Sequence, residues 1–214
     1  MDLAHFGLQG RPFRASPDSA FYYPATTHEM ALAGLLQALH EDEGCCLLTS
    51  PPGLGKTLLC HCLVERLGPE VTGAFLTNSH LPDRASLFQA ILFDFSLPYQ
   101  AMTEQELRLA LTDFLLNRYS AHQRTVLLVD EAQHLTPDLL EELRLLGNLE
   151  GASGKALQVV LAGQPDLLEL LNRPELAAFR QRLAMRVKLE ALGVQEAADY
   201  VVHQVRRAGD AART

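Results

Sequence analysis

The sequence predicts an α/β fold in which a parallel β-sheet is covered by helices on both faces. Short, continuously apolar runs alternate along the chain with longer amphipathic segments. Continuous apolar runs are typical of strands buried on both faces, and their alternation with helices indicates parallel pairing. The chain has 214 residues, of which 48% are hydrophobic and 21% are charged. It is therefore long enough and apolar enough to bury a substantial core.

The expected elements follow one another along the chain. Residues 1–25 are rich in proline and aromatic residues and are expected to form an extended arm. Thr26, with Glu29 three residues later, is expected to cap a helix that covers 30–40. Similar capping signals occur at Thr103 with Glu106 and at Thr136 before Pro137. Beyond residue 44 the pattern predicts strands at 45–49, 71–77, 125–129, 157–162 and 187–189, and helices at 56–67, 83–95, 104–120, 137–150, 166–171 and 194–207.

Composition restricts the possible function classes. The formal net charge of −8 argues against a broad DNA-binding face, which requires positive charge. No apolar run approaches the roughly 20 residues that span a membrane, and no signal peptide is visible. The cysteines at 45, 46, 60 and 62 lack the spacing of zinc ligands and are expected to be buried thiols, a metal or redox role being the alternative. These features predict a cytoplasmic protein without direct membrane insertion.

A glycine-rich segment follows the first predicted strand and opens the next helix. It reads SPPGLGKT at 50–57 and matches the phosphate-binding loop GxxxxGK[ST], except that serine replaces the first glycine. The glycines let backbone N–H groups turn toward an anion, Lys56 can reach the phosphates and Thr57 can bind Mg²⁺. A chance Gly/Pro turn would not place strand, lysine and threonine in register. We therefore predict that ATP with Mg²⁺ is bound by Ser50, Pro51, Pro52, Gly53, Leu54, Gly55, Lys56, Thr57 and Leu58.

Two acids and an amide follow the third and fourth predicted strands. Asp130 and Glu131 end one apolar run, and Gln164 ends the next. Because the carboxyl ends of parallel strands share one edge of a sheet, these side chains are expected beside the phosphate loop. Asp130 would then hold Mg²⁺ together with Thr57, Glu131 would act as general base, and Gln164 would orient the attacking water. The alternatives are a solvated acidic turn and, for Gln164, a helix-entry turn.

Two arginines, Arg180 and Arg182, lie after the next predicted helix. An exposed arginine at this point could reach the nucleotide of a neighbouring subunit as an arginine finger. The alternative is a surface arginine in a salt bridge.

Taken together, the motifs resemble the AAA+ ATPases of the ExeA, or general secretion pathway protein A, family, which includes pilus-assembly relatives. The resemblance covers nearly the whole chain, and its motifs occur in the family's order. They are FGL (6–8), PF (12–13), PD (17–18), FY (21–22), His28, the phosphate loop, DEAQ (130–133), LEELRLL with NLE (140–146 and 148–150), GQPDL (163–167), RQRL (180–183), Tyr200, His203 and AG (208–209).

The resemblance implies a P-loop NTPase with an AAA+ core that assembles into a homo-oligomer in a nucleotide-dependent way. It implies an extended arm at 1–25, the core at 26–192 and the start of an incomplete helical lid at 193–214. It also selects Arg182 as the finger. Gln204 stands where the family has arginine, and the segment that carries the second sensor arginine is not found. In the secretion branch such proteins help to build an outer-membrane secretin with a membrane partner.

Three functions remain open at this point. The leading one is an ATP-hydrolysing motor or switch that assembles a protein complex of the secretion or pilus type. The second is a DNA-associated ATPase similar to the target selectors of transposition, which would need a basic stripe that this acidic chain provides only in sparse clusters. The third is a nucleotide-binding scaffold with little turnover. A helicase is disfavoured, because the chain is too short for two cores of the RecA type.

Overall fold

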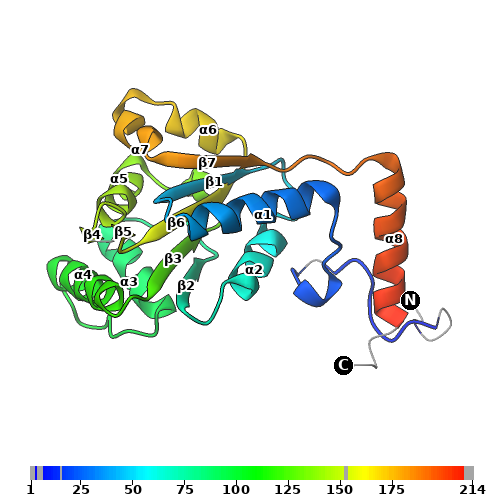
Figure 1. Cartoon of the computed structure of the whole chain (residues 1–214), viewed down its shortest axis with the longest axis horizontal. Coiled ribbons are helices and arrows are strands. Elements are labelled where there is room, and N and C mark those ends of the chain that lie inside the picture. Colours follow the sequence, from blue (N-terminus) through cyan, green and yellow to red (C-terminus); the bar gives the residue numbers. More distant parts are fainter. Residues whose placement is uncertain (1–2, 4–6, 15, 152–153, 210–214) are drawn as a thin grey trace.

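A five-stranded parallel sheet forms the centre of the molecule (Figure 1). The computed structural model describes residue 3 and residues 7–14, 16–151 and 154–209. Within them the strand order is β2-β3-β6-β1-β7, and every neighbouring pair in the sheet is parallel. The strands are β1 (Cys45–Thr49), β2 (Val71–Leu76), β3 (Arg124–Val129), β6 (Gln158–Gly163) and β7 (Leu183–Lys188).

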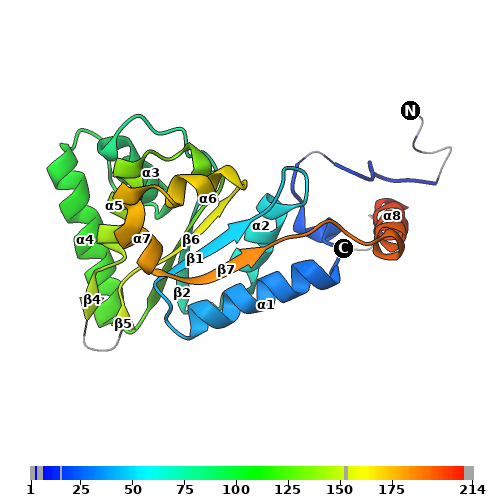
Figure 2. The ribbon, with the colours of Figure 1, turned by 90° about the horizontal axis from the view of Figure 1, so that it is seen from above.

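Helices cover both faces of this sheet (Figure 2). Alternate residues of each central strand point to opposite sides, so Val159 and Leu161 enter one core while Val160 and Ala162 enter the other. Helices α1 (Thr26–His40) and α2 (Lys56–Arg66) cover one face. The other face is covered by α3 (Arg84–Asp94), α4 (Glu104–Ser120), α5 (Pro137–Leu146), α6 (Asp166–Leu171) and α7 (Ala177–Gln181). The predicted fold class is therefore confirmed.

The structure corrects several predicted boundaries. Helix α1 begins at Thr26, so Ala25 is its N-cap and has no side-chain oxygen to cap it, while the Glu29 side chain bonds to Tyr22 and Arg66. Helix α5 ends at Leu146, four residues before the predicted end. A small hairpin of β4 (Glu150–Gly151) and β5 (Gly154–Lys155) occupies the next segment. Strand β7 is longer than predicted, and α7 was not predicted at all.

The capping predictions on the later helices are confirmed. The Thr103 hydroxyl accepts from the Glu106 amide, and the Glu106 carboxylate accepts from the Thr103 amide, which is a complete capping box. The Thr136 hydroxyl accepts from the Leu139 amide, with Pro137 at the first helical position.

The cysteines are buried and free, as expected for ordinary thiols. Burial raises the pKa of each thiol above its usual value, to about 12 for Cys46 and about 11 for Cys62. The reactive thiolate is therefore disfavoured at neutral pH.

The amino-terminal arm packs against the last helix, α8 (Val194–Gly209), which stands apart from the sheet in Figure 1. The backbone N–H of Gln9 donates to the Ala208 carbonyl at 2.9 Å, and the side-chain amide of Gln204 donates to the Phe21 carbonyl at 2.8 Å. Phe6 of the amino-terminal motif and residues 210–214 of the expected lid lie outside the described residues. The division into arm, core and lid remains a prediction.

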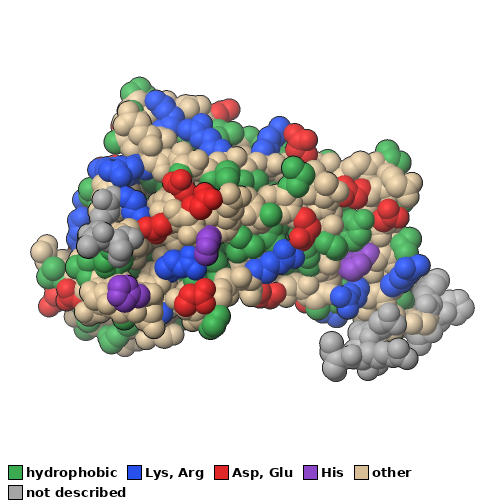
Figure 3. Space-filling model, viewed as in Figure 1, with side chains coloured by type: hydrophobic (Ala, Val, Ile, Leu, Met, Phe, Trp, Pro, Cys, Tyr) green, Lys and Arg blue, Asp and Glu red, His purple; other side chains and the backbone are tan. Residues whose placement is uncertain are grey.

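Charge is mixed over the surface seen in Figure 3, where basic and acidic side chains lie interspersed. Among the described residues, none of the helices combines the length and the apolarity needed to cross a bilayer.

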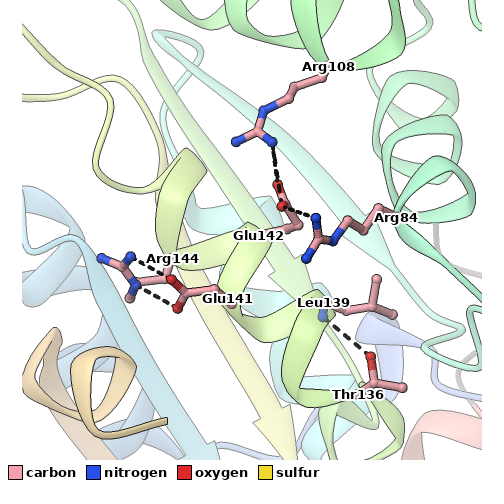
Figure 4. A network of polar contacts seen from close by, with 7 residues as sticks. All are labelled: Arg84, Arg108, Thr136, Leu139, Glu141, Glu142 and Arg144. Carbon is pink, nitrogen blue, oxygen red and sulfur yellow. Dashed lines mark hydrogen bonds and ion pairs between the residues drawn. The ribbon is translucent and has the colours of Figure 1, made fainter. Parts of the chain in front are cut away.

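A buried carboxylate joins three helices on one side of the sheet (Figure 4). Glu142 of α5 is 2% exposed at its side chain and forms ion pairs with Arg84 of α3 at 3.4 Å and Arg108 of α4 at 3.2 Å. Both arginines remain about 40% exposed. A buried charge is tolerated only when it is paired, so these contacts fix α3, α4 and α5 relative to one another.

Candidate nucleotide-binding site

The glycine-rich loop leaves the carboxyl end of β1 and enters α2 in the conformation that a phosphate cradle requires. Gly53 and Gly55 have φ angles of 82° and 84°, in the left-handed region that favours glycine. Gly55 is also the N-cap of α2, so the free amides of the first turn of this helix face the loop. The loop is therefore built for an anion.

Ser50 fits the position where the loop pattern has glycine. It is 1% exposed, its backbone N–H donates to the Gly163 carbonyl at 3.2 Å, and its hydroxyl donates to the Pro51 carbonyl at 2.9 Å. Ser50 is absent from the residues with positive φ, so its backbone does not require glycine. The serine leaves the loop conformation intact.

Lys56 and Thr57 begin α2 directly beneath the loop. Lys56 is 5% exposed, and its Nζ donates to the Ser50 carbonyl at 3.3 Å. Within the described residues no carboxylate lies within ion-pair distance of this ammonium group. A buried cation without an anionic partner is costly, and a bound phosphate would supply that partner.

Asp130 is held at the end of β3 by the neighbouring strand and by the loop helix. Its backbone N–H donates to the Leu76 carbonyl, and the Ser79 hydroxyl donates to its carbonyl. The Thr57 hydroxyl donates to Oδ2 of its carboxylate at 2.5 Å. A hydroxyl and a carboxylate oxygen held together are hard ligands of the kind that Mg²⁺ prefers. The donor set therefore fits the predicted metal.

Glu131 follows in a left-handed conformation with φ at 51°, unusual for a residue with a side chain. Its Oε2 accepts from the side-chain amides of Gln133 at 2.5 Å and Gln164 at 3.1 Å. Burial raises the pKa of Glu131, but these amide donors and the positive charges of Lys56 and His134 outweigh it and hold the pKa below its usual value. The carboxylate is therefore ionised at neutral pH.

The sheet brings the predicted residues together at one edge. The loop follows β1, Asp130 and Glu131 follow β3, and Gln164 follows β6, all at carboxyl ends of parallel strands. A cavity at this edge is lined by Lys56, Thr57 and Glu131 and closed on its far side by the arm and α8.

The cavity wall includes residues for which the sequence predicted no role. Arg14 of the arm and Tyr200 and Gln204 of α8 line it. A second cavity on the other side of the loop is lined by Tyr22, His28, Tyr200 and others, and the His28 ring is hydrogen-bonded to the Leu54 carbonyl at 2.8 Å. Aromatic residues occur both in the arm, at Phe13 and Tyr23, and in α8, at Tyr200, and their rings are in contact. These aromatic positions were the feature of the sequence from which this part of the cavity wall could have been predicted.

Arg182 lies at the opposite edge of the sheet. It immediately precedes Leu183, which pairs with Cys45 at the start of β1, whereas Ser50 follows the end of β1. Five residues of extended strand separate these points by about 17 Å, beyond the reach of an arginine side chain. Arg182 lines a separate cavity there with Arg144 and Phe179. The structure therefore does not bring Arg182 to the chain's own site.

The fold and this edge define a nucleotide-binding protein of the AAA class, and comparison with known proteins agrees. The AAA domain family matches residues 39–171, so the chain belongs to this family. The chain is 42% identical over 205 residues to General secretion pathway protein A of Aeromonas hydrophila, which confirms the resemblance noted in the sequence. That match covers 95% of this chain and 37% of the relative, so the chain spans little more than a third of the relative's length.

Solved structures show the same fold. The ORC2 protein of Aeropyrum pernix, in ADPNP–ADP complexes, matches with a TM-score of 0.68 at 16% identity, over 90% of this chain and 56% of that chain. Cdc6p of Pyrobaculum aerophilum matches with a TM-score of 0.70 at 18% identity, over 89% and 54%. At these identities the likeness concerns the fold alone.

Proposed function

We propose that this protein binds ATP with Mg²⁺ at residues 50–58 and hydrolyses it to ADP and phosphate. The observation that carries this proposal is the buried Lys56, which lacks a carboxylate partner within the described residues, beside the Thr57–Asp130 pair. In this proposal the loop amides and Lys56 bind the phosphates, while Thr57 and Asp130 hold the metal. When bound, Mg²⁺ would neutralise phosphate charge.

Glu131 takes the role of general base in this proposal. It lines the same cavity as Lys56 and Thr57, and its carboxylate is ionised at neutral pH and so is free to accept a proton from water. Gln164, at the end of the neighbouring strand, orients the water or the terminal phosphate.

The test of this assignment separates binding from turnover. We expect Glu131→Gln to bind a fluorescent ATP analogue with unchanged affinity and to lose phosphate release by about a hundredfold or more. A phosphate-release rate equal to that of the unaltered protein would remove Glu131 as the base. A protein that binds ATP but releases no phosphate at any concentration would instead be a nucleotide-binding scaffold.

Arg182 is proposed to act on the site of a neighbouring copy. Its place at the opposite edge of the sheet supports action between subunits, since it cannot reach its own phosphate loop. Lys56→Ala removes the binding site but keeps the finger, and Arg182→Ala does the reverse. Each variant alone should be inactive, and a mixture of the two should regain turnover. A mixture as inactive as its components would contradict the role between subunits.

The cellular role proposed is assembly of a protein complex of the secretion or pilus type, in the cytoplasm and as a homo-oligomer. Its support is the 42% identity to General secretion pathway protein A over 95% of this chain. The competing DNA-associated role requires a basic surface, whereas the formal charge is −8 and the face in Figure 3 is mixed. A gel shift with ATP at low and high salt tests it, and ATP-dependent, salt-sensitive DNA binding would favour the DNA role.

A further inference from the structure

Gln133 lies between the two strand ends that carry the proposed hydrolytic residues. It belongs to a short 3-10 helix, η3 (Ala132–His134), immediately after Glu131. Its Nε2 donates to Oε2 of Glu131 at 2.5 Å, and its Oε1 accepts from the backbone N–H of Gln164 at 3.1 Å. One side chain thus joins the end of β3 to the end of β6.

The surrounding groups fix the direction in which this amide points. The backbone N–H of Gln164 requires an oxygen opposite it, so the Gln133 nitrogen must face Glu131. On that side the nitrogen also lies 3.3 Å from Nε2 of His134. Gly163 leaves room for this amide, because a Cβ at that position would meet Oε1 of Gln133 at 2.8 Å. The hydrogen bonds at the two ends of the amide set its orientation.

The two oxygens of the Glu131 carboxylate differ in their hydrogen bonding. Within the described residues, every side-chain hydrogen bond that the carboxylate accepts goes to Oε2, from Gln133 and from Gln164. The residue also lines the cavity that contains Lys56 and Thr57. Two donors on one oxygen leave the other oxygen as the acceptor for a group in that cavity.

We propose that Gln133 is a positioning residue that holds Oε2 of Glu131, directs Oε1 toward the phosphate cavity and ties this orientation to the backbone of Gln164. This inference rests on the proposed hydrolytic function and assigns a role to the last residue of the DEAQ motif. A base held within a few tenths of an ångström of its productive position acts faster than one that rotates freely. A shift of β6 at Gln164 would reach Glu131 through this amide.

The first experiment does not depend on turnover. The backbone N–H of Gln164 donates to Oε1 of Gln133, so its exchange with solvent deuterium reports whether that contact exists in solution. Gln133→Met keeps the length of the side chain and removes the acceptor. The Gln164 amide should then exchange about tenfold faster in this variant, measured by NMR on the protein without nucleotide. Exchange as slow in Gln133→Met as in the unaltered protein would overturn the proposal.

The second experiment measures steady-state hydrolysis of ATP. Gln133→Met should lower kcat by about tenfold or more while KM for ATP stays within about twofold, because only the base is affected. The control is Gln105→Ala, an exposed glutamine of α4, which should change neither quantity. An equal kcat in Gln133→Met and the unaltered protein would contradict the positioning role.

The two experiments distinguish failure of this inference from failure of the proposed function. If the unaltered protein does not hydrolyse ATP, the hydrolytic function fails, and amide exchange at Gln164 still decides whether Gln133 holds the end of β6. If hydrolysis is present and Gln133→Met leaves it intact, the inference alone fails. Retained ATP binding and an unchanged melting temperature in Gln133→Met guard against a folding defect.

Discussion

The phosphate edge of the sheet and the contact between the arm and α8 form opposite walls of one cavity, but they are built differently. On the sheet side, Lys56 at the start of α2 and Asp130 after β3 are almost fully buried. The strands that lead to them are hydrogen-bonded in a continuous register. On the other side, Phe13 and Tyr200 touch at a ring-centroid distance of 6.1 Å, with Phe13 half exposed. One wall is part of the core, and the other is held by a few surface contacts.

Because of this difference, substitutions can alter ATP binding at the phosphate edge separately from closure of the cavity by the arm and α8. Buried strands open only with the whole domain, whereas a helix that contacts an arm through a few side chains can move at small cost. We therefore expect substitutions in the core wall to change stability or abolish binding. Substitutions in the arm–α8 wall should tune affinity.

The largest expected effect is on the core that supports the phosphate edge. Removing both Arg84 and Arg108 leaves the carboxylate of Glu142 buried and unpaired, so the double alanine variant should lose about 3–5 kcal/mol of unfolding free energy. Chemical denaturation measures this loss. Glu70→Ala, at an exposed ion pair, is the control and should cost less than about 1 kcal/mol. A double variant as stable as this control would show that Glu142 is not held as an ion.

The next effect is on binding at the core wall. Lys56→Ala should weaken ATP binding by about a hundredfold or more, because the main cation of the phosphate loop is lost. The melting temperature without nucleotide should stay the same or rise, since a buried ammonium group has been removed. Titration with a fluorescent ATP analogue measures the affinity. Lys188→Ala, on an exposed lysine of β7, should bind as the unaltered protein does.

A smaller effect is expected at the arm–α8 wall. Tyr200 contacts the rings of Phe13 and Tyr23, so Tyr200→Ala should loosen α8 and weaken ATP binding by about fivefold, or about 1 kcal/mol. Stability of the core should be unchanged, and limited proteolysis should cut the arm faster. The neighbouring Val201→Ala, at a half-exposed valine, is the matched control. Unchanged affinity and proteolysis in Tyr200→Ala would mean that this wall does not close the site.

The smallest effect is a pH dependence confined to the same wall. Burial and the positive charge of Arg207 lower the pKa of His203, and a backbone hydrogen bond to Tyr22 offsets this only in part. A lowered histidine pKa favours the neutral ring in the folded state. Its contribution is therefore fully present above the unfolded pKa of about 6.5 and is lost as pH falls below it.

Amide hydrogen exchange of α8 measures this dependence. Exchange, corrected for the intrinsic effect of pH, should speed up below about pH 6.5, while the strands of the core remain protected. His203→Gln should remove the pH dependence. If α8 in this variant still loosens in acid, another group is responsible.

The sequence predicted the sheet well because continuous apolar runs leave buried strands few alternatives. All five strands of the sheet were located, and the loop at 50–57 was placed between the correct strand and helix. The errors lie where local signals compete with tertiary contacts. Helix α1 begins one residue before the expected cap allows, with Ala25 as N-cap and the Glu29 side chain bonded to Tyr22 and Arg66. Strand β7 was predicted too short because its outward residues alternate with inward ones at the sheet edge.

The sequence identified the residues of the candidate site, but it did not predict the hydrogen bonds between them. Lys56, Thr57, Asp130 and Glu131 belong to short motifs whose spacing suffices to recognise them. Gln164 lies 31 positions after Gln133 and 33 after Glu131, so its hydrogen bonds to them depend on β3 and β6 being neighbours.

By itself, the sequence determined that this protein is an α/β protein with a phosphate loop, because apolar periodicity and the glycine–lysine–threonine spacing are local properties. Only the tertiary structure decided which partners those residues meet. It placed Arg182 at the far edge, put Gln133 between Glu131 and Gln164, and used the arm with α8 to close the cavity. The physical reason is that strand order and helix docking depend on packing between segments far apart in the chain, which no local pattern specifies.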